Sequence, residues 1–291
     1  MNKIAKGVIG ILAALPLGVA GLYGPAARAA PGDLDPGFGD IGRFVPAAGI
    51  GAAFSIEPRN DADLILAGGG YRRDFENVRH IYSTGFVQQL NREGALDSAF
   101  TTWSSGAPYD PGVLVRDTTL QPDGKLIAVG SAGQYPSNGG LAVLRFDEAG
   151  ALDPSFGGGG RRTYGGDLAS SVALDSDGRI VVAGVDGSDL VVLRLMQNGE
   201  LDATFADSGI FTGAALAGVR PRILPVDTGG YRVLVQDAAA TFAKCRVLAL
   251  TAAGAVDESF GVLGYADLAS TTLVSNCNSI VRSSAGRLLV A

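Results

Sequence analysis

The chain has 291 residues, of which 47% are hydrophobic and 18% charged, so it can bury a sizeable core and intrinsic disorder is excluded. Its 23 basic and 29 acidic residues give a formal net charge of −6, and no basic stripe is present, which excludes a nucleic-acid partner. The 43 glycines and 13 prolines favour many short strands joined by tight turns.

The first 29 residues have the three-part pattern of a secretory signal peptide. Two lysines precede an apolar run over residues 8–22, and Ala27-Arg28-Ala29 is a small-x-small cleavage site. The run is shorter than the roughly 20 residues that a membrane span needs, and no second run follows. The pattern predicts a secreted or periplasmic protein with a mature domain over residues 30–291 and no membrane span. An uncleaved membrane anchor is the alternative.

Five copies of a seven-residue motif, Gly-x-(Leu/Val)-Asp-x-x-Phe, divide the rest of the chain into units. Successive copies lie 49 to 62 residues apart, a period that is typical of solenoids and propellers. The motif aspartates are predicted to accept hydrogen bonds from backbone N–H groups two or three residues later, and the phenylalanines to fill the space between units. The copies end at Phe38, Phe100, Phe156, Phe205 and Phe260.

Each unit also contains a hairpin motif. The sequences LQPDGKLIAVG over residues 120–130 and LDSDGRIVVAG over residues 174–184 place Asp-Gly between two apolar runs, which is the strongest short signal for a hairpin. An apolar strand follows, as in LAVLRFDEAG over residues 141–150, and then a short run such as residues 161–164. Four short strands per unit indicate a propeller blade, in which we number the strands from the axis outward.

These motifs resemble the delta-60 repeat family of bacterial proteins, whose units look like QPDGKIVVAG, then a strand ending in Arg-(Tyr/Phe/Leu), then GSLDPSFG. The match covers nearly all of residues 34–291. It is closest at QPDGKLIAVG and ALDPSFG, and weakest at residues 58–68, where Asp-Gly is replaced. The resemblance implies a β-propeller-like fold and brings no activity or catalytic residues with it.

Counting strands gives four complete units and a fifth that the two ends of the chain share. Residues 272–291 supply a first and a second strand, and residues 35–45 supply the last turn and a fourth strand. The sequence therefore predicts an all-β propeller of about five four-stranded blades with an incomplete last blade. The missing third strand would leave an apolar edge at the carboxyl terminus, where a partner strand could associate. An open crescent of four blades is the alternative.

The sequence gives little support for a metal or cofactor. Asp175-x-Asp177-Gly178 resembles the start of a calcium loop, but no distal glutamate follows, which favours a simple hairpin turn. Two cysteines and a single histidine do not make a zinc site. In an oxidising compartment Cys245 and Cys277 could form a disulfide, and two buried free thiols are equally compatible with the sequence.

Three connections of unequal length fall in one sector of one face of the predicted propeller: residues 69–84, 101–112 and 131–140. Binding residues concentrate on loops above a rigid scaffold, and Tyr, Trp and Arg dominate binding energies. The opposite face has short, uniform turns and is predicted to be structural. The candidate ligand-binding residues are therefore Tyr71, Arg72, Arg73, His80, Tyr82, Trp103, Tyr109 and Tyr135.

The favoured function is an exported, non-enzymatic binding or interaction module for an unknown protein or glycan. No catalytic residue is expected, since His80 has no nucleophile motif beside it. Two alternatives stay open. One is a polysaccharide hydrolase or lyase with carboxylates in the central channel, and the other is a structural or truncated repeat fragment without activity of its own.

Overall fold

The computed structural model describes most of the chain beyond the predicted signal peptide, and every regular element in the described part is a β-strand. The chain divides into two compact units, Met1–Phe44 and Val45–Ala291. The described residues are 34–35, 37–40, 43–44, 52–60, 63–73, 81–105, 112–135, 137–215, 220–227, 229–237, 244–268 and 277–291.

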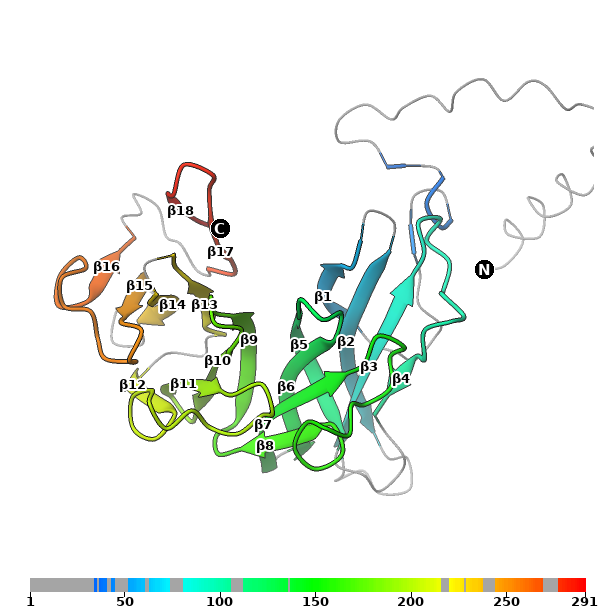
Figure 1. Ribbon diagram of the computed structural model, residues 1–291, viewed down its shortest axis with the longest axis horizontal. Coiled ribbons are helices and arrows are strands. Elements are labelled where there is room, and N and C mark those ends of the chain that lie inside the picture. Colours follow the sequence, from blue (N-terminus) through cyan, green and yellow to red (C-terminus); the bar gives the residue numbers. More distant parts are fainter. Residues whose placement is uncertain are drawn as a thin grey trace, which may run out of the picture. The chain divides into compact units, whose positions relative to one another are not determined.

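The second unit contains four successive blades, each a meander of four antiparallel strands built from one predicted repeat (Figure 1). Blade one comprises β1 (Ala52–Pro58), β2 (Leu64–Arg73), β3 (Ile81–Leu90) and β4 (Trp103–Ser104). Blade two comprises β5 (Val113–Leu120), β6 (Leu126–Tyr135), β7 (Ser137–Phe146) and β8 (Arg161–Tyr164). Blade three comprises β9 (Leu168–Leu174), β10 (Ile180–Asp186), β11 (Asp189–Leu195) and β12 (Ile210–Ala215). Blade four comprises β13 (Arg222–Pro225), β14 (Tyr231–Asp237), β15 (Lys244–Leu250) and β16 (Tyr265–Asp267).

The predicted turn role of the five motif aspartates is confirmed. Each side chain accepts a hydrogen bond from the backbone N–H two residues later, at 2.9 to 3.2 Å. The aspartate carboxylate takes the place of a backbone carbonyl as the acceptor for this N–H group. The hydrogen bond thereby fixes the turn that leads from the third to the fourth strand. The donor residues are Gly37, Ala99, Ser155, Thr204 and Ser259.

Three of the motif phenylalanines, Phe100, Phe156 and Phe205, fill the space between neighbouring blades, as predicted. Phe156 is fully buried in a cluster that joins blade two to blade three. Its ring lies against the backbone of Gly199, the first residue of the next motif copy, where an added Cβ would stand 2.7 Å from the ring. Gly199 also has a φ of +83°, so this position needs glycine for two reasons. The same pairing joins Phe100 to Gly150 and Phe205 to Gly254.

Main-chain hydrogen bonds couple the same turns from blade to blade. Gly157 N donates to Asn198 O at 3.2 Å, and Ala206 N donates to Ala253 O at 2.7 Å. Between blades two and three Tyr164 adds a side-chain bond from its hydroxyl to the carbonyl of Gly199. Burial raises the pKa of Tyr164 to about 12, so its hydroxyl keeps the donated proton at physiological pH.

β17 (Ile280–Arg282) and β18 (Leu288–Val290) form a two-stranded sheet after blade four. They are the first and second strands that the sequence predicts for the last blade. Among the described strands β17 pairs only with β18, so these strands do not close into a ring. The predicted all-β fold with four-stranded blades is confirmed, whereas a blade shared by the two chain ends stays a prediction.

Cys245 and Cys277 are joined by a disulfide, with their Cα atoms 6.1 Å apart. Cys245 is buried in β15, and Cys277 precedes β17, so the bond ties blade four to the strands β17 and β18. Of the two possibilities that the sequence leaves open, the structure has the disulfide. In the described residues there is no helix with the length and apolar character that a membrane crossing requires.

Candidate functional site

The β2–β3 and β6–β7 hairpins extend further than the corresponding hairpin of blade three. The β10–β11 hairpin ends at the Asp186–Asp189 pair, with a two-residue turn. The other two continue to the pairs Arg73–Ile81 and Gln134–Ser137. These extensions are the two insertions that the sequence singles out as ligand-binding loops.

The two extended hairpins pair with each other. Ile81 lies opposite Tyr135, and Tyr82 lies opposite Gln134, so β3 and β6 run antiparallel across the boundary between blades one and two. The result is a four-stranded sheet in the order β2-β3-β6-β7. We call it the hairpin platform, and it comprises residues 70–73, 81–84, 131–135 and 137–140.

Five of the eight predicted ligand-binding residues are backbone positions of the hairpin platform: Tyr71, Arg72, Arg73, Tyr82 and Tyr135. Arg72 lies opposite Tyr82, which in turn lies opposite Gln134. The platform therefore brings residues of two blades into register with one another. His80 and Tyr109 lie outside the described residues.

Trp103 belongs to the core between blades one and two. It is half-buried in β4, and its ring meets that of Phe146 edge-on, with the centroids 5.3 Å apart. Just after it, Ser105 Oγ donates to Val113 O at 3.1 Å and accepts from Gly85 N at 2.8 Å. The beginning of this connection is thus fastened to the scaffold and does not project with the platform.

The first strand of each blade, which we call the inner strand, is β1, β5, β9 or β13. These inner strands hold a second set of candidate residues, which the sequence did not predict. Each of the first three inner strands has a β-bulge at the same place, at Phe54, Arg116 and Ser170. Opposite each bulge stands the glycine that ends the hairpin motif. A Cβ on Gly130 would lie 1.9 Å from Leu114 O, so only glycine permits the bulge. The repeated glycine was the signal that could have revealed it.

Polar side chains link the inner strands next to these bulges, and we call them the inner belt: Ser55, Asp117, Thr118, Ser170, Ser171 and Arg222. Between β1 and β5, Ser55 Oγ and Thr118 Oγ1 lie 2.8 Å apart. Between β5 and β9, Val172 N donates to Asp117 Oδ2 at 3.1 Å. Arg222 of β13 closes the row, with Nη1 3.5 Å from Asp117 Oδ2.

Two carboxylates of the inner strands have raised pKa values. Burial raises the pKa of Asp117, although the nearby Arg222 guanidinium and backbone N–H donors oppose this shift. Burial also raises the pKa of Glu57, which accepts a hydrogen bond from Leu120 N at 3.2 Å. The negative charge of Asp117 adds to the shift at Glu57. Both carboxylates therefore join neighbouring inner strands through backbone donors.

An exposed aromatic ring on β1 lies near two cations, one on β5 and one just before β13. Phe54 is 37% exposed, and the guanidinium carbons of Arg116 and Arg220 lie 4.5 Å and 5.9 Å from its ring centroid. Such contacts are attractive because the face of the ring carries partial negative charge. The bulges at Phe54 and Arg116 explain how two side chains from neighbouring strands come together.

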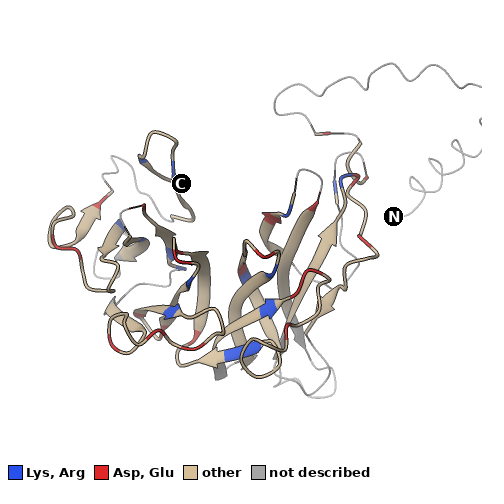
Figure 2. Ribbon diagram, in the orientation of Figure 1, with Lys and Arg blue, Asp and Glu red and all other residues tan. Residues whose placement is uncertain are grey.

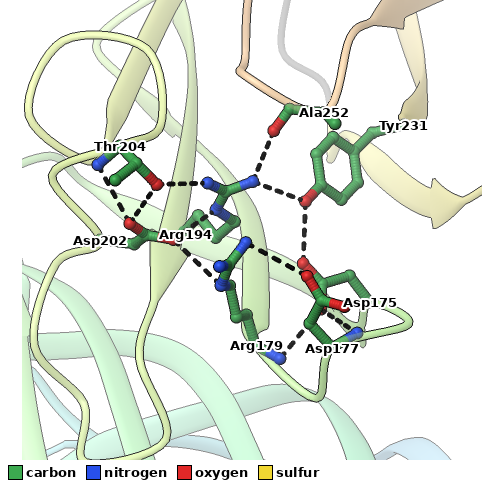
Figure 3. Close-up of polar contacts among 8 residues, drawn as sticks. All are labelled: Asp175, Asp177, Arg179, Arg194, Asp202, Thr204, Tyr231 and Ala252. Carbon is green, nitrogen blue, oxygen red and sulfur yellow. Dashed lines mark hydrogen bonds and ion pairs between the residues drawn. The ribbon is translucent and has the colours of Figure 1, made fainter. Parts of the chain in front are cut away.

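At the opposite ends of the strands, acidic residues gather in the connecting turns, as Figure 2 shows. In blade three the motif carboxylate of Asp202 lies 2.9 Å from Arg194 Nε and 3.2 Å from Arg179 Nε (Figure 3). Arg194 also donates to Thr204 Oγ1 at 3.0 Å and to the carbonyl of Ala252 in blade four. We call this arrangement a turn cluster.

Blade two contains an equivalent turn cluster. The carboxylate of Asp153 lies 2.8 Å from Arg145 Nε and 3.1 Å from Lys125 Nζ, and Arg145 donates to the carbonyl of Gln197 in blade three. Burial acts to raise the pKa of Asp153, but hydrogen bonds from Ser155 and the two cations outweigh it and hold the pKa well below its usual range. The cluster links the two blades, and every charge in it is paired.

Among the described residues, no group of three or more His, Cys, Asp and Glu side chains is placed to hold a metal ion. Asp175, which resembled the start of a calcium loop, instead accepts hydrogen bonds from Asp177 N at 3.0 Å and from Tyr231 OH at 3.0 Å. Figure 3 shows this contact beside the turn cluster of blade three.

Two segments of the chain, residues 121–156 and 176–205, match the family model described as "Domain of unknown function (DUF5122) beta-propeller". The fold is that of a β-propeller. The matched segments belong to blades two and three, which carry the complete turn clusters. Blades one and four lie outside the match and have Gln89 and Ala249 in place of the third-strand arginine.

Solved structures of low sequence identity are also similar. A proposed gluconolactonase has 14% identity, covers 77% of this chain and 70% of its own, and gives a TM-score of 0.38. A protein of unknown function from Bacteroides caccae has 12% identity, covers 73% of this chain and 84% of its own, and gives a TM-score of 0.34. An endo-arabinase from Bacteroides thetaiotaomicron has 14% identity, covers 78% of this chain and 83% of its own, and gives a TM-score of 0.39. At these values the named activities are not transferred to this chain. No curated protein matches it.

Proposed function

We propose that the protein is an exported β-propeller that acts as a binding module, with the hairpin platform as its surface for a protein or glycan ligand. The observation that carries this proposal is the pairing of β3 with β6 at Ile81–Tyr135 and Tyr82–Gln134. Two insertions that only covered the edges of their own blades would have no reason to pair with each other. Their pairing supports a rigid surface above the scaffold.

The composition of the platform supports contact with a partner. Its strands include three tyrosines and two arginines among the residues named above, and these residue types dominate binding energies at interfaces. Among the described strands, residues 70–73 of β2 pair only with β3, so the outer edge of the platform can accept a strand of a partner.

The binding role is favoured over a polysaccharide hydrolase by what the inner carboxylates do. A glycosidase needs two carboxylates that face the substrate, one of them free to take or give a proton. Asp117 and Glu57 instead accept backbone hydrogen bonds from the next inner strand, at 3.1 Å and 3.2 Å. Such carboxylates serve the scaffold.

Export and membership of the delta-60 repeat family belong to the same proposal. The signal-like amino terminus supports export, and the Cys245–Cys277 disulfide is the kind of bond that persists in an oxidising compartment. Expression of the full chain in a bacterial host tests this, since sequencing of the periplasmic product should begin at Ala30. A product that retains the first 29 residues in the membrane fraction would contradict export.

The platform is tested by replacing residues 71–83 with Asn-Gly, which closes the β2–β3 hairpin at the Gly70–Thr84 pair. Replacing Gly187-Ser188 of the β10–β11 hairpin with the same dipeptide is the matched control. On glycan and protein arrays the platform variant should lose at least one ligand that the unaltered protein and the control bind, while its melting temperature stays near theirs. Unchanged binding by the shortened variant would overturn the assignment.

A further inference from the structure

Within the described residues, three adjoining hollows lie on the turn face, at the strand ends opposite the hairpin platform. The largest set of polar groups lines a hollow of about 430 Å³ between blades two and three. It shares Gln121 and Asp123 with a neighbouring hollow towards blade one, and Gln197 and Asn198 with another along blade three. A hollow of this size is in the range of small-molecule sites. The sequence predicts only a structural role for this face.

Gln121 is the residue that points to a ligand. Only 7% of it is exposed, yet its side-chain Oε1 has no hydrogen-bond partner among the described residues, and it lines two of the hollows. Buried polar atoms nearly always have a partner. The backbone of Gln121 is fixed by a tight turn, since its N–H donates to Lys125 O at 2.7 Å and its carbonyl accepts from Gly124 N at 2.9 Å.

The charges of the hollow argue for a neutral ligand. Lys125 Nζ lies 3.1 Å from Asp153 and 3.8 Å from Asp123, and Arg145 is held by Asp153 at 2.8 Å. Because the cations are already paired with carboxylates, an anionic group would gain little by entering. A cationic ligand would be repelled by Lys125 and Arg145, which line the hollow.

The backbone of the hollow argues against a peptide. The turns that line it use their own main-chain groups: Met196 N donates to Glu200 O at 2.7 Å, and Gly199 N donates to Met196 O at 2.9 Å. No strand edge is among the lining residues, so main-chain pairing with a peptide has no place there. What the hollow offers is side-chain amides.

We propose that the hollow between blades two and three binds a neutral saccharide, whose hydroxyl groups hydrogen-bond to the amides of Gln121 and Asn198. A hydroxyl group both donates and accepts, so it can pair with whichever end of the Gln121 amide faces the hollow. Asn198 is exposed, and its Oδ1 already accepts from Glu200 N at 3.0 Å, which leaves its amide N–H groups to donate to a neighbouring ligand oxygen.

The experiment uses the mature chain and neutral hexasaccharides of glucose, xylose and arabinose, with binding measured by calorimetry. Gln121→Leu and Asn198→Ala should each lower the affinity for the saccharide that binds by tenfold or more. The matched control is Gln88→Leu, because Gln88 is also buried with an unpartnered amide nitrogen but lines none of these hollows. Asn198→Ala alters an exposed side chain, so it tests the site even if Gln121→Leu fails to fold.

Several results would overturn the proposal. They are the absence of binding at millimolar saccharide, an affinity of both variants equal to that of the unaltered protein, or stronger binding of an oligogalacturonate or of an unstructured peptide than of the neutral sugars. The variant that lacks residues 71–83 should keep this binding, since its change lies at the other end of the strands. Failure of the hairpin platform and failure of this site are thus separate outcomes.

Discussion

Blades three and four are each attached to the next part of the chain, but by different chemistry. In blade three Arg194 pairs with the buried Asp202 and reaches across to the carbonyl of Ala252 in blade four. In blade four the equivalent third-strand position is Ala249, which cannot make either contact. The Cys245–Cys277 disulfide joins β15 of blade four to the segment before β17, next to an exposed ion pair between Arg282 of β17 and Asp227 of blade four.

The difference shows that one link between blades can be electrostatic or covalent. A buried arginine with a carboxylate partner stabilises only if its charge and its donors are satisfied, and in blade three Arg194 has three further acceptors besides Asp202. A disulfide works without such a network because it limits the unfolded chain. The fixed part of the repeat is therefore the geometry of the meander, and the chemistry of the link can change.

Removing the phenylalanine between blades should have the largest effect, and more so in blade three than in blade four. Phe205 is fully buried and meets Tyr231 edge-on at 5.8 Å between centroids, whereas Phe260 is only half-buried. Phe205→Ala should lower the free energy of unfolding by about 3–5 kcal/mol. Phe260→Ala should cost less than half of that, as measured by urea denaturation. Equal losses would show that burial does not distinguish the two blades.

Breaking the turn cluster should come next. Arg194→Met keeps most of the side-chain volume but leaves the carboxylate of Asp202, which is 4% exposed, with Arg179 as its remaining cation. We expect a loss of about 3 kcal/mol in the free energy of unfolding. Arg246→Met is the control in blade four, since its partner Asp267 is largely exposed, and should cost about 0–1 kcal/mol. A loss near zero for Arg194→Met would show that the cluster adds no stability.

The disulfide should contribute somewhat less. It closes a loop of 32 residues, and replacing both Cys245 and Cys277 with Ser should cost about 2–3 kcal/mol. The reduced protein should unfold at the same urea concentration as the double variant, and reductant should leave the double variant unchanged. If reductant does not alter the unfolding of the unaltered protein, the bond does not carry the link that we assign to it.

The smallest effect should be seen in the pH dependence of stability. Burial acts to raise the pKa of Asp202, but hydrogen bonds from Thr204 and the two arginine charges outweigh it and lower the pKa. Its contribution to stability is therefore present above the unfolded pKa of about 4 and is lost as the pH falls towards the folded pKa. Asp202→Asn should flatten the loss of stability that occurs as the pH falls below about 4. An unchanged slope would contradict the lowered pKa.

The contribution of Asp117 to stability should depend on pH in the opposite direction to that of Asp202. Because burial raises its pKa, the folded state disfavours its ionised form, and protonation as the pH falls from neutrality relieves that cost. In Asp117→Asn, stability should therefore gain less, relative to the unaltered protein, when the pH is lowered from about 7 towards 4. Thermal unfolding at a series of pH values separates this change from that of Asp202→Asn.

Much of the fold could be predicted because the repeats record it locally. Asp-Gly between apolar runs indicates a hairpin wherever it occurs, and the motif aspartates and phenylalanines have the same turn and packing roles in successive blades. The unequal lengths of the second-to-third connections also singled out most of the residues of the hairpin platform. Trp103 was predicted to bind a ligand because of its residue type, whereas in the structure its ring packs against Phe146 in the core.

The candidate sites could be predicted only in part, because they depend on contacts between blades. Nothing in the spacing of residues 69–84 and 131–140 indicates that their strands pair at Ile81–Tyr135. The same holds for the bulges that bring Arg116 to the ring of Phe54, and for the buried, unpartnered amide of Gln121. These contacts join residues that are far apart in the chain, or depend on side chains that pack around them.

The amino-acid sequence by itself determined the strand order, the turns and the apolar faces of each blade, since these follow from local periodicity and from backbone preferences of glycine and aspartate. Only the tertiary structure decided which blade surfaces meet and how they are joined. It placed Gly199 under Phe156, set Arg194 against blade four, and used the disulfide for the link that Ala249 cannot make. Such choices depend on close packing between distant segments, which no local pattern encodes.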